Sequence, residues 1–250
     1  MSNSIIYALD FDGVICDSAV ETALTGWKAA SSLWQEMPAT APQIAIERFR
    51  SIRPIIETGY ESILAMRLLY LNEPLDAICN NPTSKMAALM QEANIDVDGL
   101  KQLFGDTRDA WIASDLTGWL NMNPLFEGIA EKLQQLGQNH TWYIITTKQE
   151  RFVRQILQAH NIELNNQYIY GLDRNMGKVE VLKGLLQKHP GTTLYFAEDR
   201  LPTLLNVLKT HELNQVKLIF ALWGYNTTED KANAAKQPFL SQNLGNFLSQ

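Results

Sequence analysis

Two aspartates, Asp10 and Asp12, stand two residues apart directly after the apolar run of residues 5–9. On extended backbone, side chains two positions apart point to the same side, so we expect the two carboxylates to lie close together. Carboxylates at that separation repel each other unless a cation or a proton separates their roles. One arrangement that satisfies this constraint keeps Asp10 ionised and bound to a metal, while Asp12 carries a proton and acts as an acid.

Three further reactive groups follow other apolar runs or open a helical pattern: Thr146, Lys178 and Asp199. In an open parallel sheet, ligands bind beyond the carboxyl ends of the strands, so we expect these groups to converge on the two aspartates. Asp199 would complete an oxygen-rich site suited to Mg²⁺. Thr146 would offer its hydroxyl and nearby backbone N–H groups to an anion, and Lys178 would add a positive charge. Together these groups predict phosphoryl transfer through an aspartyl-phosphate intermediate.

The alternation of apolar runs and helical patterns predicts an α/β fold. Short apolar runs of the length of buried strands occur at residues 5–9, 142–145, 193–197 and 216–222, with a weaker one at 168–170. Between them, apolar residues recur at spacings of three and four, which indicates helices at residues 128–136, 151–160 and 179–187. Strands that alternate with helices form βαβ units around a parallel sheet.

The long stretch between the first two expected strands has helical periodicity broken by prolines. Helices at residues 44–53 and 55–70 are expected to meet at Pro54, because proline suits a first helical turn and interrupts an existing helix. Arg50 and Arg53 are three residues apart, so they would share a helix face and grip the anionic end of a substrate. A solvated face or an internal salt bridge is an equal alternative.

These patterns predict a two-part architecture. A Rossmann-like, three-layer core with a parallel sheet is expected over residues 1–18 and 120–250, and an α-helical cap domain is inserted at residues 19–119.

The core sequence resembles the haloacid dehalogenase (HAD) superfamily, and within it the phosphoglycolate-phosphatase-like hydrolases. Four stretches resemble the four motifs of that family in order: Asp-Phe-Asp-Gly-Val at residues 10–14, Ile-Ile-Thr-Thr-Lys at 144–148, Gly-Lys at 177–178 and Phe-Ala-Glu-Asp at 196–199. A single Asp-x-Asp-Gly is weak evidence, whereas four motifs in order at strand ends are specific. The resemblance also implies a HAD-like core that carries a helical cap.

The family mechanism, carried over position by position, implies a role for each of these residues. Asp10 would attack phosphorus, and Asp12 would protonate the leaving oxygen and then deprotonate the hydrolytic water. Thr146 and Lys178 would hold the transferring group. Asp199 would bind Mg²⁺ together with Asp10 and the backbone carbonyl of Asp12. Because dehalogenases of the superfamily lack an acid at the position of Asp12, the resemblance disfavours halide displacement.

The site has two candidate additions and one departure from the family pattern. Thr147 and Lys148 are candidate phosphate contacts, with a solvated surface charge as the alternative for Lys148. The fourth family motif usually carries a second acid about four positions after the first, and here that position is Thr203. Glu198, directly before Asp199, is the candidate to replace it, either by ligating the metal or by supporting the ligands.

The letters Asp-x-Asp-Gly recur at residues 96–99, between two helical stretches. Aspartate is a favoured residue at helix N-termini, so we expect Asp98 to cap the following helix and assign it no chemistry.

Composition narrows the function classes further. The net charge of −6 at pH 7 argues against a general nucleic-acid binder, which needs a basic surface. The longest wholly apolar run, residues 218–223, is far shorter than the roughly 20 residues that a bilayer crossing needs. The first residues resemble no signal sequence, and two cysteines form no disulfide framework, so we expect a cytoplasmic protein.

The sequence therefore predicts a Mg²⁺-dependent phosphatase whose partner is a small phosphorylated metabolite, with no nucleic acid or membrane partner. Two alternatives stay open at this point. A phosphomutase would use the same aspartates, and a non-catalytic HAD-like descendant would bind a phosphorylated ligand or a protein.

Overall fold

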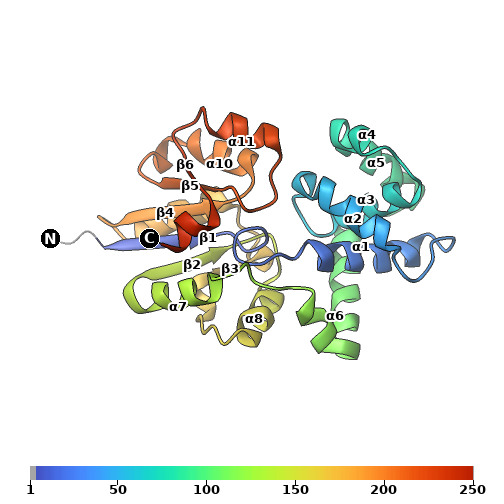
Figure 1. Cartoon of the computed structure of the whole chain (residues 1–250), viewed down its shortest axis with the longest axis horizontal. Coiled ribbons are helices and arrows are strands. Elements are labelled where there is room, and N and C mark those ends of the chain that lie inside the picture. The colour runs from blue at the N-terminus through green and yellow to red at the C-terminus, as the bar shows by residue number, and fades with distance from the viewer. Residues whose placement is uncertain (1–3, 250) are drawn as a thin grey trace. The chain divides into compact units, whose positions relative to one another are not determined.

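The computed structural model describes residues 4–249 and divides the chain into two compact units (Figure 1). The core unit comprises the chain up to Asp17 and from Leu125 onward, and the helical unit comprises Ser18–Pro124. The boundary expected at residue 119 falls inside helix α6, Val97–Asn121, so the helical unit extends a few residues further than the sequence predicted.

Within residues 4–249, the core unit contains a six-stranded sheet in the order β3-β2-β1-β4-β5-β6, with every neighbouring pair parallel. This is the strand order of a doubly wound Rossmann-like sheet, so the predicted α/β fold is confirmed. The strands are β1 (Ile5–Leu9), β2 (Thr141–Ile145), β3 (Ile169–Tyr170), β4 (Thr193–Glu198), β5 (Lys217–Ala221) and β6 (Leu240–Gln242).

Helices cover both faces of this sheet. In Figure 1, α7 and α8 lie on the opposite side of the sheet from α10 and α11. Alternate residues of the strands, such as Ile6, Ala8 and Phe196, form one hydrophobic core with α9 and α10. The helices of the core unit are α7 (Ile129–Asn139), α8 (Glu150–Ala159), η2 (Asn166–Tyr168), η3 (Leu172–Arg174), α9 (Lys178–Lys188), α10 (Leu201–Leu208), η4 (His211–Leu213), α11 (Thr228–Ala234) and α12 (Leu244–Leu248).

The helical unit packs around its own hydrophobic core, in which Trp27, Phe49 and Leu64 are almost completely buried. Its α1 and α3 make the most extensive contact of the unit. The elements of this unit are α1 (Ala19–Leu33), α2 (Gln43–Ile52), η1 (Arg53–Ile55), α3 (Glu61–Tyr70), α4 (Leu75–Asn80), α5 (Pro82–Glu92) and α6 (Val97–Asn121).

Two local predictions in the helical unit are wrong. The helix expected from residue 55 begins at Glu61, because the Glu61 carboxylate accepts hydrogen bonds from the N–H groups of Glu57 and Thr58 and holds them in a loop. The cap of α6 is Asp96 rather than Asp98, since the Asp96 side chain accepts the N–H of Gly99 at 2.7 Å.

None of the helices in residues 4–249 combines the length and the apolar character that a membrane crossing requires.

A buried ion pair ties α1 to α6. Glu21 is fully buried, and its two carboxylate oxygens accept hydrogen bonds from Arg108 at 2.7 Å (Nε) and 2.6 Å (Nη2). Trp119 and Thr25 donate to the same carboxylate at 3.1 Å and 2.7 Å. Removing the Arg108 cation would leave the buried Glu21 carboxylate without its opposite charge, and this costs free energy.

We expect Arg108→Met to lower the free energy of unfolding of the helical unit by about 3–5 kcal/mol, because Glu21 would keep its charge in a buried place. Lys101→Met, which breaks the exposed Lys101–Asp98 pair on the same helix, is the matched control and should change it by less than about 1 kcal/mol. Urea denaturation followed by circular dichroism measures both. Equal midpoints for the two variants would contradict this account of the pair.

Candidate active site

The register of two neighbouring strands brings the first and fourth motifs together. Leu9 of β1 pairs with Ala197 of β4, and the N–H of Asp10 donates to the Ala197 carbonyl at 2.9 Å. The residues that follow, Asp10 on one strand and Glu198 and Asp199 on the other, therefore meet at the carboxyl edge of the sheet. The strand order reverses between β1 and β4, and this is where ligands bind in open α/β sheets.

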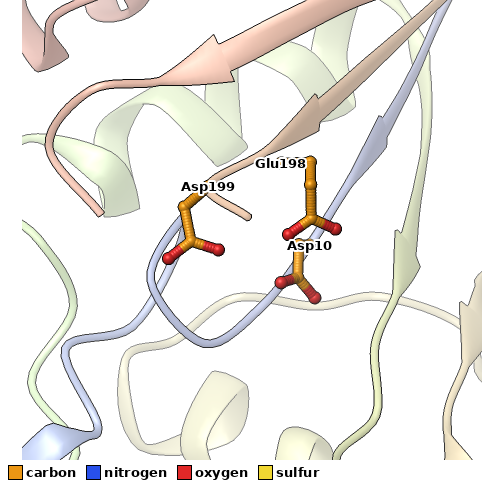
Figure 2. Close-up of side chains that lie close together, drawn as sticks. All are labelled: Asp10, Glu198 and Asp199. Carbon is orange, nitrogen blue, oxygen red and sulfur yellow. The ribbon is translucent and has the colours of Figure 1, made fainter. Parts of the chain in front are cut away.

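Three carboxylates gather at this edge. Asp10, Glu198 and Asp199 each offer an oxygen, and these oxygens lie within 4.8 Å of one another (Figure 2). The exposed fractions of the three residues are 6%, 0% and 1%. A set of hard oxygen donors held this close fits a divalent cation, which would offset their mutual repulsion. The carboxylate of Asp12 is not part of this cluster. The metal contact expected of Asp12 uses its backbone carbonyl instead, and that contact stays a prediction.

Lys178 contacts two carboxylates of this cluster. Its Nζ lies 2.9 Å from Oδ1 of Asp10 and 2.7 Å from Oε2 of Glu198. Asp10 and Glu198 continue the alternation of Ala8 and Phe196, whose side chains pack toward α9. Because Lys178 is the first residue of α9, its side chain meets both carboxylates on that face.

Burial and opposing charges shift the pKa values of this group. Burial, together with the negative charge of Glu198, raises the pKa of Asp10 to about 7, although Lys178 acts in the opposite direction. Burial lowers the pKa of Lys178, but Asp10 and Glu198 outweigh it and hold that pKa above its ordinary value. Lys178 therefore stays an ammonium, while Asp10 changes charge near neutral pH.

A second lysine contacts the second aspartate. Nζ of Lys148 donates to Oδ1 of Asp12 at 2.8 Å, and the side chains of these residues are 1% and 16% exposed. The alternative of a solvated surface charge for Lys148 is therefore wrong.

Thr146 and Thr147 begin the turn after β2. Oγ1 of Thr146 accepts the N–H of Lys148 at 3.0 Å, and this bond does not use the hydroxyl hydrogen of Thr146. The N–H of Thr146 itself donates to the carbonyl of Tyr170 at 2.9 Å. These two N–H groups are thus engaged within the fold, and the expected contact of the Thr146 hydroxyl and other nearby backbone N–H groups with an anion stays a prediction. Thr147 is half-buried.

The turn after β5 supports the acidic cluster, and the sequence analysis does not identify this role. The N–H of Tyr225 donates to Oδ2 of Asp199 at 2.5 Å. Gly13 has a φ of +93°, and a Cβ at this position would overlap the Asp199 carboxylate. A Cβ at Gly224 would also overlap the Asp199 side chain. A backbone donor leaves no side-chain pattern, so the glycine in the turn after each strand is the signal that points to this contact.

The remaining predicted residues lie outside this cluster. Thr203 is half-buried in the first turn of α10, whereas Glu198 is part of the carboxylate cluster.

Arg50 and Arg53 belong to the helical unit. Arg50 is exposed on α2, and Arg53 is buried in η1, where Nη1 donates to the carbonyl of Ile56 at 2.8 Å. Their contact with substrate stays a prediction.

The raised pKa of Asp10 gives a pH-dependent stability. The folded protein keeps the Asp10 proton up to about pH 7, whereas the unfolded chain releases it near the ordinary value of 3.8. The folded state therefore binds more protons in this window, and in metal-free buffer Asp10 should make the free energy of unfolding fall as the pH rises through it. Urea denaturation from about pH 4 to about pH 8 should show a smaller fall for Asp10→Asn. Parallel curves for the two proteins would refute the shift.

Comparison with known proteins identifies the fold. No protein-family model and no curated relative matches the chain. Among solved structures, a predicted phosphatase from Clostridium acetobutylicum is 16% identical, with a TM-score of 0.60 over 99% of this chain and 98% of that one. A predicted phosphoglycolate phosphatase from Haemophilus somnus is 16% identical, with a TM-score of 0.57 over 91% and 89% of the two chains. A haloacid dehalogenase-like family hydrolase from Streptococcus pneumoniae is 18% identical, with a TM-score of 0.52 over 93% and 91%. The chain therefore has the fold of the haloacid dehalogenase-like hydrolases.

Proposed function

We propose that this chain is a Mg²⁺-dependent phosphatase that hydrolyses a small phosphorylated metabolite through an aspartyl-phosphate on Asp10. One observation carries the proposal. The Asp10 carboxylate stands at the carboxyl edge of the sheet, 2.9 Å from the buried ammonium of Lys178 and beside two further buried carboxylates. This combination fits a nucleophile whose substrate is a phosphate ester. The phosphatases among the structural neighbours support the same reaction class.

In the first step of the proposed reaction, a carboxylate oxygen of Asp10 forms a bond to phosphorus as the bond to the leaving oxygen breaks. Asp12 gives its proton to the leaving oxygen. The Lys178 ammonium and the hydroxyl of Thr146 compensate the negative charge of the transferring group. Mg²⁺ held by Asp10, Asp199 and the backbone carbonyl of Asp12 would neutralise further charge on that group.

In the second step, Asp12 removes a proton from a water molecule. The resulting hydroxide attacks the aspartyl-phosphate, free phosphate leaves, and the Asp10 carboxylate is restored. Asp12 again carries a proton, so the cycle closes without an outside acid or base. Transfer of the phosphoryl group to a second hydroxyl instead of water would make the chain a phosphomutase, and analysis of the products distinguishes the two.

We also propose that the protein works in the cytoplasm. Cys16 and Cys79 are reduced thiols, the first buried and the second exposed, and a reducing compartment keeps thiols in that state.

Removing the nucleophile should abolish turnover. We expect Asp10→Asn to lower the rate of phosphate release from a panel of small phosphate esters by more than about 10³-fold, since the amide cannot attack phosphorus. Asp98→Asn changes the second aspartate of the other Asp-x-Asp-Gly, where the side chain is exposed, and should stay within about twofold of the wild type. Wild-type turnover in Asp10→Asn would overturn the proposed mechanism.

Metal removal tests the role of the acidic cluster. Activity should disappear in a chelator and return with Mg²⁺. Glu198→Gln should raise the Mg²⁺ concentration for half-activation by about 10–100-fold, because a carboxylate of the cluster loses its charge. Thr203→Val is the matched control, since Thr203 lies outside the cluster, and it should leave this concentration unchanged. Full activity in the chelator would contradict the metal site.

A further inference from the structure

Lys148 is buried and fixed at three points. Its Nζ donates to Asp12 at 2.8 Å, its N–H donates to Oγ1 of Thr146 at 3.0 Å, and its carbonyl accepts the N–H of Leu172 at 3.1 Å. The Nζ also lies 5.9 Å from the centre of the Phe11 ring, a side chain with no exposed surface. A lysine held this firmly beside an apolar ring interacts more strongly with its carboxylate than a solvated lysine does.

Each of the two lysines of the site contacts a different aspartate. Lys178 contacts Asp10 and Glu198, whereas Lys148 contacts Asp12. The Lys178 charge is shared by a pair of carboxylates, but no second carboxylate is seen within salt-bridge distance of Lys148 among residues 4–249. The charge of Lys148 is therefore directed at the residue that the proposed function makes the acid and base.

We propose that Lys148 is a positioning residue for Asp12. Lys148 orients the Asp12 side chain by holding Oδ1, and it stabilises the Asp12 carboxylate at the moment the proton leaves. This inference rests on the proposed phosphatase function. Lys148 holds Oδ1 of Asp12, so Oδ2 is the oxygen from which a proton would pass to the leaving oxygen as its bond to phosphorus breaks. The carboxylate formed is paired with the Lys148 ammonium until the hydrolytic water returns a proton. Lys148 keeps its charge throughout and transfers no proton.

The competing role for Lys148 is direct contact with the phosphoryl group, the other interpretation that its place in the sequence allows. The two roles differ in the substrates that they favour. Contact with the phosphoryl group helps every phosphate ester equally, because that group is common to all of them. Help given through Asp12 matters only where the leaving oxygen needs a proton.

The experiment compares two esters of similar size. Benzyl phosphate releases an alkoxide that must be protonated, whereas 4-nitrophenyl phosphate releases a phenolate that is stable without a proton. We expect Lys148→Met to lower kcat/KM about 10–100-fold for benzyl phosphate and less than about threefold for 4-nitrophenyl phosphate. Because kcat/KM reports the reaction only through the first irreversible step, the later hydrolysis of the aspartyl-phosphate does not mask the difference.

Two variants control for charge and for folding. Lys148→Arg keeps a cation beside Asp12 and should recover part of the benzyl phosphate activity. Lys183→Met removes another lysine of the core unit, which pairs with Glu212 at 2.8 Å on the surface, and should not discriminate between the esters. Circular dichroism of each variant checks that it is folded.

A double-mutant cycle supplies a second, independent readout. In the Asp12→Asn background, Lys148→Met should have less than about a threefold effect on benzyl phosphate, because the residue through which Lys148 acts is already disabled. This double variant also removes both partners of the buried pair, so it leaves no unpaired charge to unfold the protein.

The possible results distinguish a failure of the positioning role of Lys148 from a failure of the phosphatase function. Equal losses on both esters, or effects of Lys148→Met and Asp12→Asn that multiply, would overturn the positioning role while the phosphatase function stands. A wild-type protein that hydrolyses neither ester and none of the panel would overturn the phosphatase function, and this inference with it.

Discussion

Three carboxylates buried side by side are the electrostatic constraint on which the rest of the core unit depends. Asp10, Glu198 and Asp199 have lost nearly all contact with solvent, and like charges at this separation raise the cost of each other's ionisation. Lys178 offsets part of that cost by contacting two of them, and the backbone N–H of Tyr225 serves the third. The pKa of about 7 for Asp10 shows that the compensation is incomplete. A carboxylate left in this state gains from an added cation, which is the condition for a metal-dependent site.

The register of the sheet and the start of α9 determine which carboxylates and which lysine meet in this cluster. Since Leu9 pairs with Ala197, the alternation of β1 and β4 turns Asp10 and Glu198 toward the face that α9 covers. A slip of one residue in β4 would exchange Glu198 for Asp199 on that face and would also turn Phe196 out of the core, so the packing of the core protects the site. The lysine is fixed by the start of α9 in the same way, because one step along a helix rotates a side chain by about 100°.

The sequence predicts the features that apolar runs and strand ends determine, and it fails where one specific side-chain contact, local or between distant residues, decides the outcome. The strands at the centre of the sheet are long and apolar, so they could be predicted, whereas β6 has three residues and an exposed Leu240 and could not. The start of α3 depends on one carboxylate, that of Glu61, bonding two backbone N–H groups. Likewise, the role of Lys148 is ambiguous until the fold places it against Asp12, 136 residues away along the chain.

The two occurrences of Asp-x-Asp-Gly show why local sequence is not sufficient for chemistry. At residues 96–99 the first aspartate caps α6 and the second is exposed beside Lys101, a contact made within one helix. At residues 10–13 the same letters follow a central strand, so each aspartate meets a lysine that another element supplies. Asp10 shares its lysine with a second carboxylate and keeps a raised pKa, while Asp12 has a buried lysine of its own. Two aspartates that are equivalent in the local sequence thus meet different partners: Asp10 lies in the buried carboxylate cluster that fits a divalent cation, whereas Asp12 lies outside it and is paired with Lys148.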